Sequence, residues 1–402
     1  MSARFLIVST MAACACASSI LVACATDDSV SFAEPDAATS VPEPDSGALD
    51  GSVEASTDDG GAFAEPCPPD AFCPSESFGP QKPAGSLDPR VRIATIRGRS
   101  ANDVWAVGAL GTILHFDGTS WERSDPGTES SINAIWPRDT GEVALSSLMA
   151  AAYTRGIELD GGVDAGPSAG GWTARPLPEI GSLGRGWLTS TWAVPGAEWL
   201  WCTTMEDARP LPYNGLWRLR VAPSADALEI GEVAPLGTCN TFPCRHLKSI
   251  HGVTANELWA VGFTGATVHI TNAQGESPKI TPIDSQTWTD LHGVWAASET
   301  EAWGVGAKGT ILRFTRGSTI SEIVSNVPTN ETLRAVWGTS PTDIWAVGDK
   351  SVVLHFDGKT WSEVEVAGVP EPRPDLYTVY AAAPGRVWAA GEGVFLSLGG
   401  KP

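Results

Sequence analysis

A tryptophan-containing apolar pattern recurs seven times between residues 91 and 400, and this repeat limits the possible folds more than any other feature. The clearest copy begins with Leu-Arg-Ala-Val-Trp-Gly at Leu333, continues with Asp-Ile-Trp-Ala-Val-Gly at Asp343 and ends near Trp361. When the copies are aligned on the second of these segments, the equivalent positions are Trp105, Ala144, Leu200, Trp259, Trp303, Trp345 and Trp388. Such a repeat predicts small units that are stable only when they pack on one another.

Each copy contains four short apolar runs separated by Gly, Pro, Asn, Asp or Ser, and these runs predict four β-strands. Four strands in about 42 residues are typical of one β-propeller blade. The chain also contains 43 Gly and 30 Pro but only 18% charged residues, which favours strands and turns over helices. We therefore predict an all-β protein with a single seven-bladed β-propeller of four-stranded blades over residues 89–402, preceded by a disordered tether.

The first strand of each copy indicates where the centre of the ring lies. Its third residue is small in every copy, as expected where the sheets converge on the axis: Thr95, Ala134, Ser190, Ser249, Gly293, Ala335 and Thr378. Its second residue is predicted to line a water-filled central channel: Ala94, Asn133, Thr189, Lys248, His292, Arg334 and Tyr377. Arg97 and His251 replace a tryptophan of this strand, and we expect them to mark a polar pocket.

The last copy stops after Leu398 and lacks its fourth strand. An open ring would leave sheet edges unpaired. We therefore predict that residues within 76–90 supply the missing strand and close the ring.

Two turns carry a resemblance to known propellers. The sequences Asp-Gly-Thr-Ser-Trp at Asp117 and Asp-Gly-Lys-Thr-Trp at Asp357 resemble the Asp-box of BNR and sialidase-type propellers, with one residue fewer between Asp and Gly. The whole 91–400 region is similar to the Trp-Ala-Val-Gly propeller repeats of secreted bacterial lipoproteins and, more distantly, to photosystem II assembly-factor propellers. This resemblance implies a fold but no activity, because propellers host many unrelated functions.

Residues 1–23 are apolar or small apart from Arg4, and they indicate a secretory signal peptide rather than a strongly inserting transmembrane helix. The sequence Leu-Val-Ala-Cys that ends at Cys24 resembles the bacterial lipobox, which implies that Cys24 is lipidated and becomes the mature N-terminus. Ala25 stands where an inner-membrane retention signal has Asp. The resemblance therefore implies a lipoprotein of the outer membrane, on its periplasmic or extracellular face.

Residues 24–88 are predicted to be an acidic tether. They contain 14 Asp or Glu residues but only one basic residue, Lys82, and they show no apolar period. Such a segment cannot bury enough surface to offset the entropy of ordering, and its like charges keep it extended. The net charge of the whole chain is −21, which argues against a nucleic-acid partner.

The eight cysteines suggest disulfides rather than a metal site. Cys67 and Cys73 are close in sequence and are predicted to form a small disulfide loop, as secretion allows. Cys202 lies at the end of a second strand, whereas Cys239 and Cys244 precede the first strand of the next blade. These places share one face of a propeller, so Cys202 could pair with either of the two. A local Cys239–Cys244 disulfide is the alternative, and the spacing does not favour zinc.

No catalytic motif stands out. The sequence has no Gly-Lys-Ser/Thr phosphate loop, no Gly-x-Ser-x-Gly elbow and no His-Glu-x-x-His pair, and nothing places the residues of a sialidase site. His115 and His355 occupy equivalent positions of the repeat, which favours a structural role for both. We therefore predict a protein that is not an enzyme and needs no cofactor or metal.

Irregular insertions at 205–215 and 235–245 are predicted on one face of the ring, where loops on a rigid scaffold often carry function. The candidate binding residues are Glu206, Asp207, Arg209, Tyr213 and Arg245. We predict a monomeric cell-surface lipoprotein that binds or scaffolds a protein or glycan partner of the cell envelope. A secreted glycan-active hydrolase or lyase is the alternative, and an assembly factor without a soluble ligand is a third possibility.

Overall fold

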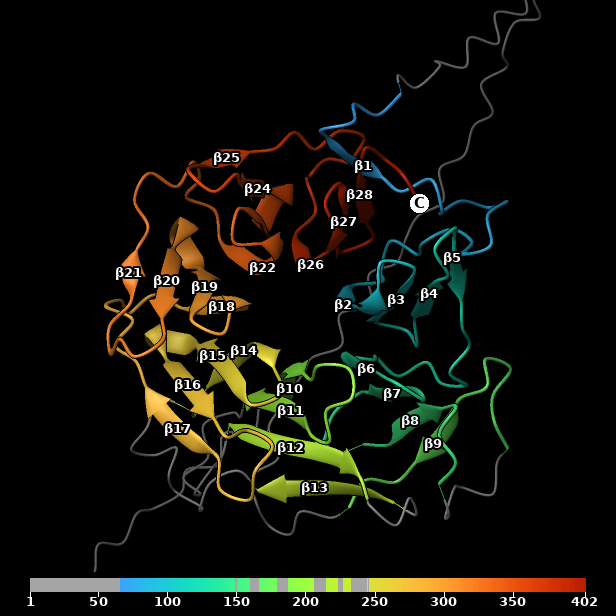
Figure 1. The fold of residues 1–402 in the computed structure, drawn as a ribbon. Coiled ribbons are helices and arrows are strands. Elements are labelled where there is room, and N and C mark those ends of the chain that lie inside the picture. The colour runs from blue at the N-terminus through green and yellow to red at the C-terminus, as the bar shows by residue number, and fades with distance from the viewer. Residues whose placement is uncertain are drawn as a thin grey trace, which may run out of the picture. The chain divides into compact units, whose positions relative to one another are not determined.

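The computed structural model describes residues 66–402, apart from residue 149 and residues 160–165, 179–186, 206–214, 223–226, 233–243 and 245. The signal peptide, Cys24 and most of the acidic segment therefore lie outside the described residues. The described chain forms seven four-stranded sheets arranged as blades around a ring, which confirms the predicted fold class (Figure 1).

In every blade the strands pair in antiparallel order from the centre outwards. The innermost strands are β2 (Ile93–Ser100), β6 (Ala134–Arg138), β10 (Trp187–Trp192), β14 (Leu247–Thr254), β18 (Leu291–Ser298), β22 (Leu333–Ser340) and β26 (Leu376–Ala383). The second strands are β3 (Asp103–Gly108), β7 (Gly141–Leu145), β11 (Leu200–Met205), β15 (Glu257–Gly262), β19 (Glu301–Gly306), β23 (Asp343–Gly348) and β27 (Arg386–Gly391).

The third strands are β4 (Ile113–Phe116), β8 (Ala152–Arg155), β12 (Leu216–Val221), β16 (Thr267–Thr271), β20 (Ile311–Thr315), β24 (Val353–Phe356) and β28 (Phe395–Leu398). The outer strands are β5 (Trp121–Arg123), β9 (Thr173–Arg175), β13 (Leu228–Glu232), β17 (Lys279–Pro282), β21 (Glu322–Ile323), β25 (Trp361–Glu363) and β1 (Phe72–Pro74). Three short 3-10 turns follow second strands: η1 (Phe263–Gly265), η2 (Ala307–Gly309) and η3 (Asp349–Ser351).

A carboxylate, a tryptophan and a histidine form one unit within a blade. The Trp345 indole N–H donates to Asp343 Oδ1 at 2.9 Å, and His355 Nε2 lies 2.8 Å from the same oxygen. The His355 ring stacks on Trp345 with centroids 4.1 Å apart. Blade one repeats this arrangement with Asp103, Trp105 and His115. The repeated histidines therefore have the structural role that their spacing predicts.

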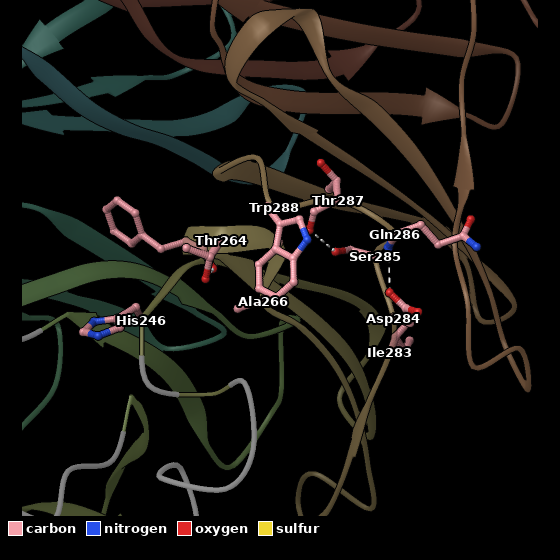
Figure 2. A pocket seen from close by; sticks show the side chains of 11 residues that line it. His246, Thr264, Ala266, Ile283, Asp284, Ser285, Gln286, Thr287 and Trp288 are labelled. Carbon is pink, nitrogen blue, oxygen red and sulfur yellow. Dashed lines mark hydrogen bonds between the residues drawn. The ribbon is translucent and has the colours of Figure 1, made fainter.

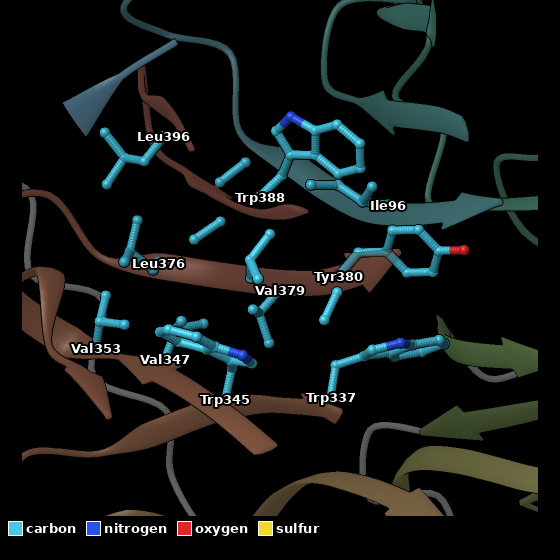
Figure 3. Close-up of a cluster of buried hydrophobic side chains, with 14 of the residues drawn as sticks. Ile96, Trp337, Trp345, Val347, Val353, Leu376, Val379, Tyr380, Trp388 and Leu396 are labelled. Carbon is cyan, nitrogen blue, oxygen red and sulfur yellow. The ribbon is translucent and has the colours of Figure 1, made fainter. Parts of the chain in front are cut away.

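Aromatic side chains fill the space between neighbouring blades, and Figure 3 shows part of this core. Trp388 of blade seven contacts Phe116 and Trp121 of blade one, with ring centroids 5.1 and 5.5 Å apart. Trp303 of blade five lies 6.0 Å from Trp361 of blade six. Because each buried ring removes a large apolar area from water, these contacts hold the blades together.

The glycine that ends each Trp-Ala-Val-Gly segment permits a close backbone approach. A Cβ atom added at Gly348 would collide with the Thr332 carbonyl oxygen at the entrance to β22. Four other blades have the same contact, at Gly108, Gly262, Gly306 and Gly391. The repeat therefore fixes the entrance to the inner strand, and with it the residues at one end of the channel.

The ring is closed by β1, which pairs with β28 through Phe72↔Leu398, Cys73↔Ser397 and Pro74↔Leu396. The Phe72 N–H also donates to the Glu365 carbonyl at 2.8 Å. The N-terminal segment thus supplies the missing strand, but the predicted window of 76–90 is wrong. The strand lies just before that window, inside the segment predicted as tether. Phe72 is fully buried, and it is this apolar side chain that completes blade seven.

Candidate functional site

One end of the channel opens into a cavity of about 320 Å³, which we call the channel mouth. Its lining contains all seven second residues of the inner strands, as the repeat predicts: Ala94, Asn133, Thr189, Lys248, His292, Arg334 and Tyr377. Arg92, Trp187, Leu188 and Met205 complete the lining. The loops between second and third strands and the connections between blades surround this end, so it lies on the face predicted to carry the binding loops.

The cations of the channel mouth differ in how they are balanced. Arg334 forms ion pairs with Asp349 and, at 3.2 Å, with Asp375. Lys248 has its Nζ 4.4 Å from the centroid of Phe263 and forms no ion pair with a described residue. Burial lowers the pKa of Lys248; the carboxylate of Asp290 opposes this shift, and Arg334 adds to it. A partner that carried a carboxylate would therefore find a poorly hydrated cation that forms no ion pair with a described residue.

Two further side chains, Arg92 and His292, contribute to the electrostatics of the channel mouth. Arg92 has its Cζ 5.1 Å from the centroid of Tyr377, and within the described part of the chain it too lacks an ion-pair partner. Burial, together with Lys248 and Arg334, lowers the pKa of His292 to about 4. His292 is therefore neutral at pH 7 and can exchange hydrogen bonds without adding to the positive charge.

A second hollow on the same face, which we call the Trp288 pocket, lies at the junction of blades four and five (Figure 2). It measures about 590 Å³ and is lined by His246, Phe263–Ala266 and Ile283–Trp288. The Thr264 N–H donates to Asp290 Oδ1 at 2.8 Å, which fixes one wall. The Trp288 side chain is 88% exposed, and Trp187 at the channel mouth is 70% exposed.

Phe263 connects the two hollows. Its ring lines the Trp288 pocket and also lies under the ammonium group of Lys248, which belongs to the channel mouth. The face therefore combines cations with two exposed indole rings, one on blade three (Trp187) and one at the junction of blades four and five (Trp288). Exposed aromatic side chains with neighbouring charges are common at sites that recognise other molecules.

The residues three positions after those that line the channel mouth form what we call the aromatic layer: Arg97, Trp136, Trp192, His251, Trp295, Trp337 and Tyr380. Arg97 and His251 both contact Trp337, at 4.6 Å from Cζ to the ring centroid and 4.7 Å between centroids. Arg97 lines a small cavity with Trp136, Trp192 and Tyr380. The two residues expected to mark a polar pocket thus come together.

The predicted binding residues cannot be placed against these hollows. Glu206, Asp207, Arg209, Tyr213 and Arg245 all lie outside the described residues. Their sequence neighbours do reach the site, because Met205 lines the channel mouth and His246 lines the Trp288 pocket. Sequence reasoning missed Trp187, Trp288 and Arg92. The one signal that could have found the two tryptophans is that neither occupies a recurring position of the repeat.

The structure agrees with only some of the predicted disulfide pairings. Cys67 and Cys73 form the predicted disulfide. Cys244 is disulfide-bonded, and Cys239 lies outside the described residues. Cys202 is free, so the proposed pairing of Cys202 with either is wrong. Its thiol is buried in β11 among apolar side chains of blades two and three, and this burial raises its pKa.

Two absences can be stated for the described residues. They contain no group of three or more His, Cys, Asp or Glu side chains that could hold a metal ion. They also contain no helix that is long and apolar enough to span a membrane.

No protein-family model matches the sequence, and no curated protein matches it either. Solved structures share the fold. YCF48 from Cyanidioschyzon merolae is 15% identical with a TM-score of 0.55, covering 77% of this chain and 95% of that chain. A structure of YCF48 bound to D1 peptide gives a TM-score of 0.54 at 15% identity, covering 77% and 92%. A catalytically inactive virginiamycin B lyase from Staphylococcus aureus with quinupristin gives 0.55 at 14% identity, covering 77% and 95%. At these identities the likeness shows the propeller fold alone.

Proposed function

We propose that this protein is a non-enzymatic binding module of the bacterial cell surface, which presents the channel mouth to a protein or glycan partner. The observation that carries the proposal is the pairing of exposed Trp187 and Trp288 with Lys248 and Arg92, two cations without carboxylate partners among the described residues, on one face. Indole faces bind apolar or sugar-ring surfaces, and the cations select negative charge. The partner is therefore expected to carry carboxylates.

The chemistry of the face supports binding over turnover. Arg334 is held by two carboxylates, and His292 is kept neutral by its surroundings. Asp290, the carboxylate that acts on His292, accepts a hydrogen bond from the Thr264 N–H, and no hydrogen bond joins it to His292 among the described residues. A rigid ring with such a face is suited to holding a partner, and a YCF48 propeller of the same fold has been solved with a bound peptide. Lipidation at Cys24 would place this ring at the outer membrane.

The test uses the full-length protein and two probe sets, acidic peptides and uronic-acid oligosaccharides, measured by calorimetry. We expect one set to bind and the substitutions Lys248→Ala and Trp187→Ala to weaken that binding by about tenfold each. Lys279→Ala, on the exposed outer strand β17, is the matched control and should leave affinity unchanged. Equal affinities in all four proteins would contradict the proposed surface.

The same oligosaccharides distinguish the enzymatic alternative. Binding without any cleaved or eliminated product supports the module. Product formation that is abolished by replacing a single carboxylate would instead show a glycan-active hydrolase or lyase. The proposed anchor is tested separately by Cys24→Ala, which should move the protein from the membrane to the soluble fraction.

A further inference from the structure

Three hydrogen-bond donors in the aromatic layer are buried and have no acceptor. They are Arg97 Nε, Trp192 Nε1 and His251 Nε2, which come from the inner strands of blades one, three and four. Buried polar groups in folded proteins almost always have a partner, so a cluster of orphaned donors needs an explanation. The aromatic layer is distinct from the proposed binding face and lies three residues further along the inner strands.

The tautomer of His251 follows from its contacts. The Ala296 N–H donates to His251 Nδ1 at 3.0 Å, so Nδ1 carries no proton and the neutral ring holds its proton on Nε2. Burial and the positive charge of Arg97 lower the pKa of His251, which keeps the ring neutral. Nε2 is therefore a donor, like the indole N–H of Trp192 and the Nε–H of Arg97. The three atoms are donors of different chemical types, and none of them has an acceptor among the described residues.

The three side chains that carry these donors all contact Trp337. The rings of Trp192 and His251 pack with centroids 3.8 Å apart, and both contact Trp337, at 5.7 and 4.7 Å. The Arg97 guanidinium lies over the same ring, with Cζ 4.6 Å from its centroid. Figure 3 shows Trp337 and Tyr380 side by side in this layer. Side chains from three blades thus surround one position.

The guanidinium of Arg97 carries a charge that no carboxylate among the described residues balances. Burial lowers its pKa to about 10, so it stays positive at neutral pH. Its Nη1 donates to the Ile96 carbonyl at 2.8 Å, and the guanidinium makes a cation–π contact with the Trp337 ring. Yet no Asp or Glu of the described chain forms an ion pair with it. A buried cation without a counter-ion is strongly unfavourable, so an external anion would stabilise this site.

Space for a small ligand exists beside the guanidinium. Arg97 lines a cavity of about 40 Å³ with Trp136, Trp192 and Tyr380. It also lines a cavity of about 80 Å³ that contains Lys248, His292 and Arg334. The first has room for a ligand the size of one or two waters, and the second connects the layer with the cationic side of the channel. An anion could therefore enter along a positively charged route.

We propose that Arg97, Trp192 and His251 form a binding site for a small monovalent inorganic anion of the size of chloride. A water molecule could accept two of the three donors but would leave the charge of Arg97 without a counter-ion. An anion accepts all three and neutralises the guanidinium. Its binding would join blades one, three and four around the axis.

Melting temperature tests the site in the full-length protein. Chloride replaces gluconate at constant ionic strength, because gluconate is too large for the cavity. We expect the melting temperature to rise with the logarithm of chloride concentration, by about 3 °C or more near saturation. Arg97→Met should abolish this rise. Arg138→Met is the matched control, because Arg138 stacks over Trp136 in the same layer at 4.9 Å, and it should keep the rise.

Bromide keeps the test decisive if Arg97→Met does not fold. Crystals of the unaltered protein grown in sodium bromide should show an anomalous peak within hydrogen-bond distance of Arg97 Nε and His251 Nε2. A water or empty density at that position, or melting temperatures that are equal in chloride and gluconate, would overturn the proposal. Failure of either test leaves the proposed binding face unaffected, because that face is probed with different ligands and variants.

Discussion

The two ends of the channel are built from the same seven strands but have opposite chemistry. At the channel mouth, second residues such as Lys248, His292 and Arg334 are partly exposed, and Arg334 is balanced by neighbouring carboxylates. Three residues further on, most side chains of the aromatic layer are buried, Arg97 and Trp192 are partly buried, and Arg97 has no counter-ion among the described residues. A short advance along a β-strand thus separates a surface open to a partner from one where buried polar atoms need a partner within the fold.

This contrast requires a closed ring, and opening it should have the largest effect. Deleting residues 70–75 removes β1 and the buried Phe72, which contacts Trp345 at 5.6 Å. We expect the melting temperature to fall by about 10 °C or more, because blade seven loses both a strand and a core side chain. Deleting residues 40–45 is the control and should have little effect. Equal melting temperatures for both deletions would contradict closure by β1.

The aromatic layer should matter more for stability than the mouth. Trp337 is buried between three neighbouring rings, and Trp337→Ala should cost about 3–5 kcal/mol in the free energy of unfolding. Tyr377→Ala, at the mouth, should cost about 1 kcal/mol. Guanidinium titrations followed by tryptophan fluorescence give both values. Similar losses at the two positions would break the comparison.

The two ends should also differ in their response to acid. The pKa of His292 is lowered to about 4, and that of His251 is lowered by burial and by Arg97. An unfolded histidine takes up a proton near pH 6.5, whereas these folded histidines do not, so the free energy of unfolding should fall as the pH drops from about 7 towards 4.

Two variants separate these contributions in urea titrations at several pH values. Each of His292→Gln and His251→Gln should flatten the pH dependence over that range, and the more deeply buried His251 should account for the larger part. The groups that act on His292 are Lys248, Arg334 and Asp290. A pH dependence that is unchanged in both variants would show that neither histidine is neutral in the folded protein.

The smallest effect is expected for the balanced charge at the mouth. Arg334→Met breaks the pairs with Asp349 and Asp375, whose side chains are partly exposed, and should cost no more than about 1 kcal/mol. The loss should shrink in 1 M salt because the charges are screened. It should also leave the chloride response of the aromatic layer intact. A loss that persists in high salt would mean that Arg334 acts through packing.

More of the structure could be predicted from the repeated strand pattern than from the loops that connect the strands. Because every blade obeys the same geometry, the register of Trp345 was enough to assign the channel residues at Lys248, His292 and Arg334. Arg97 was recognised for the same reason, because it replaces the tryptophan that the first-strand pattern has at this position. Phe72 could not be assigned, because a three-residue strand carries almost no periodic signal.

Features outside the repeat could not be derived. Trp187 is the first residue of β10 and Trp288 lies in the connection before β18, and neither position recurs as an exposed tryptophan in another blade. The pairing of Cys202 was mispredicted because Cys202 was expected at the end of a second strand, whereas it lies inside β11 and its side chain packs in the core between blades two and three. The candidate residues between 206 and 245 belong to insertions, which no blade geometry constrains.

The covalent loop between Cys67 and Cys73 has a mechanical consequence. A pulling force on the N-terminal segment is transmitted from Cys67 through the disulfide to Cys73, which is the middle residue of β1. The intervening residues carry no tension, so the pairing of Phe72 with Leu398 is spared from peeling. A load would have to shear Cys73 from Ser397 rather than unzip the strand from its end. The disulfide thus reinforces the closing strand β1 at the point where the N-terminal segment joins the ring.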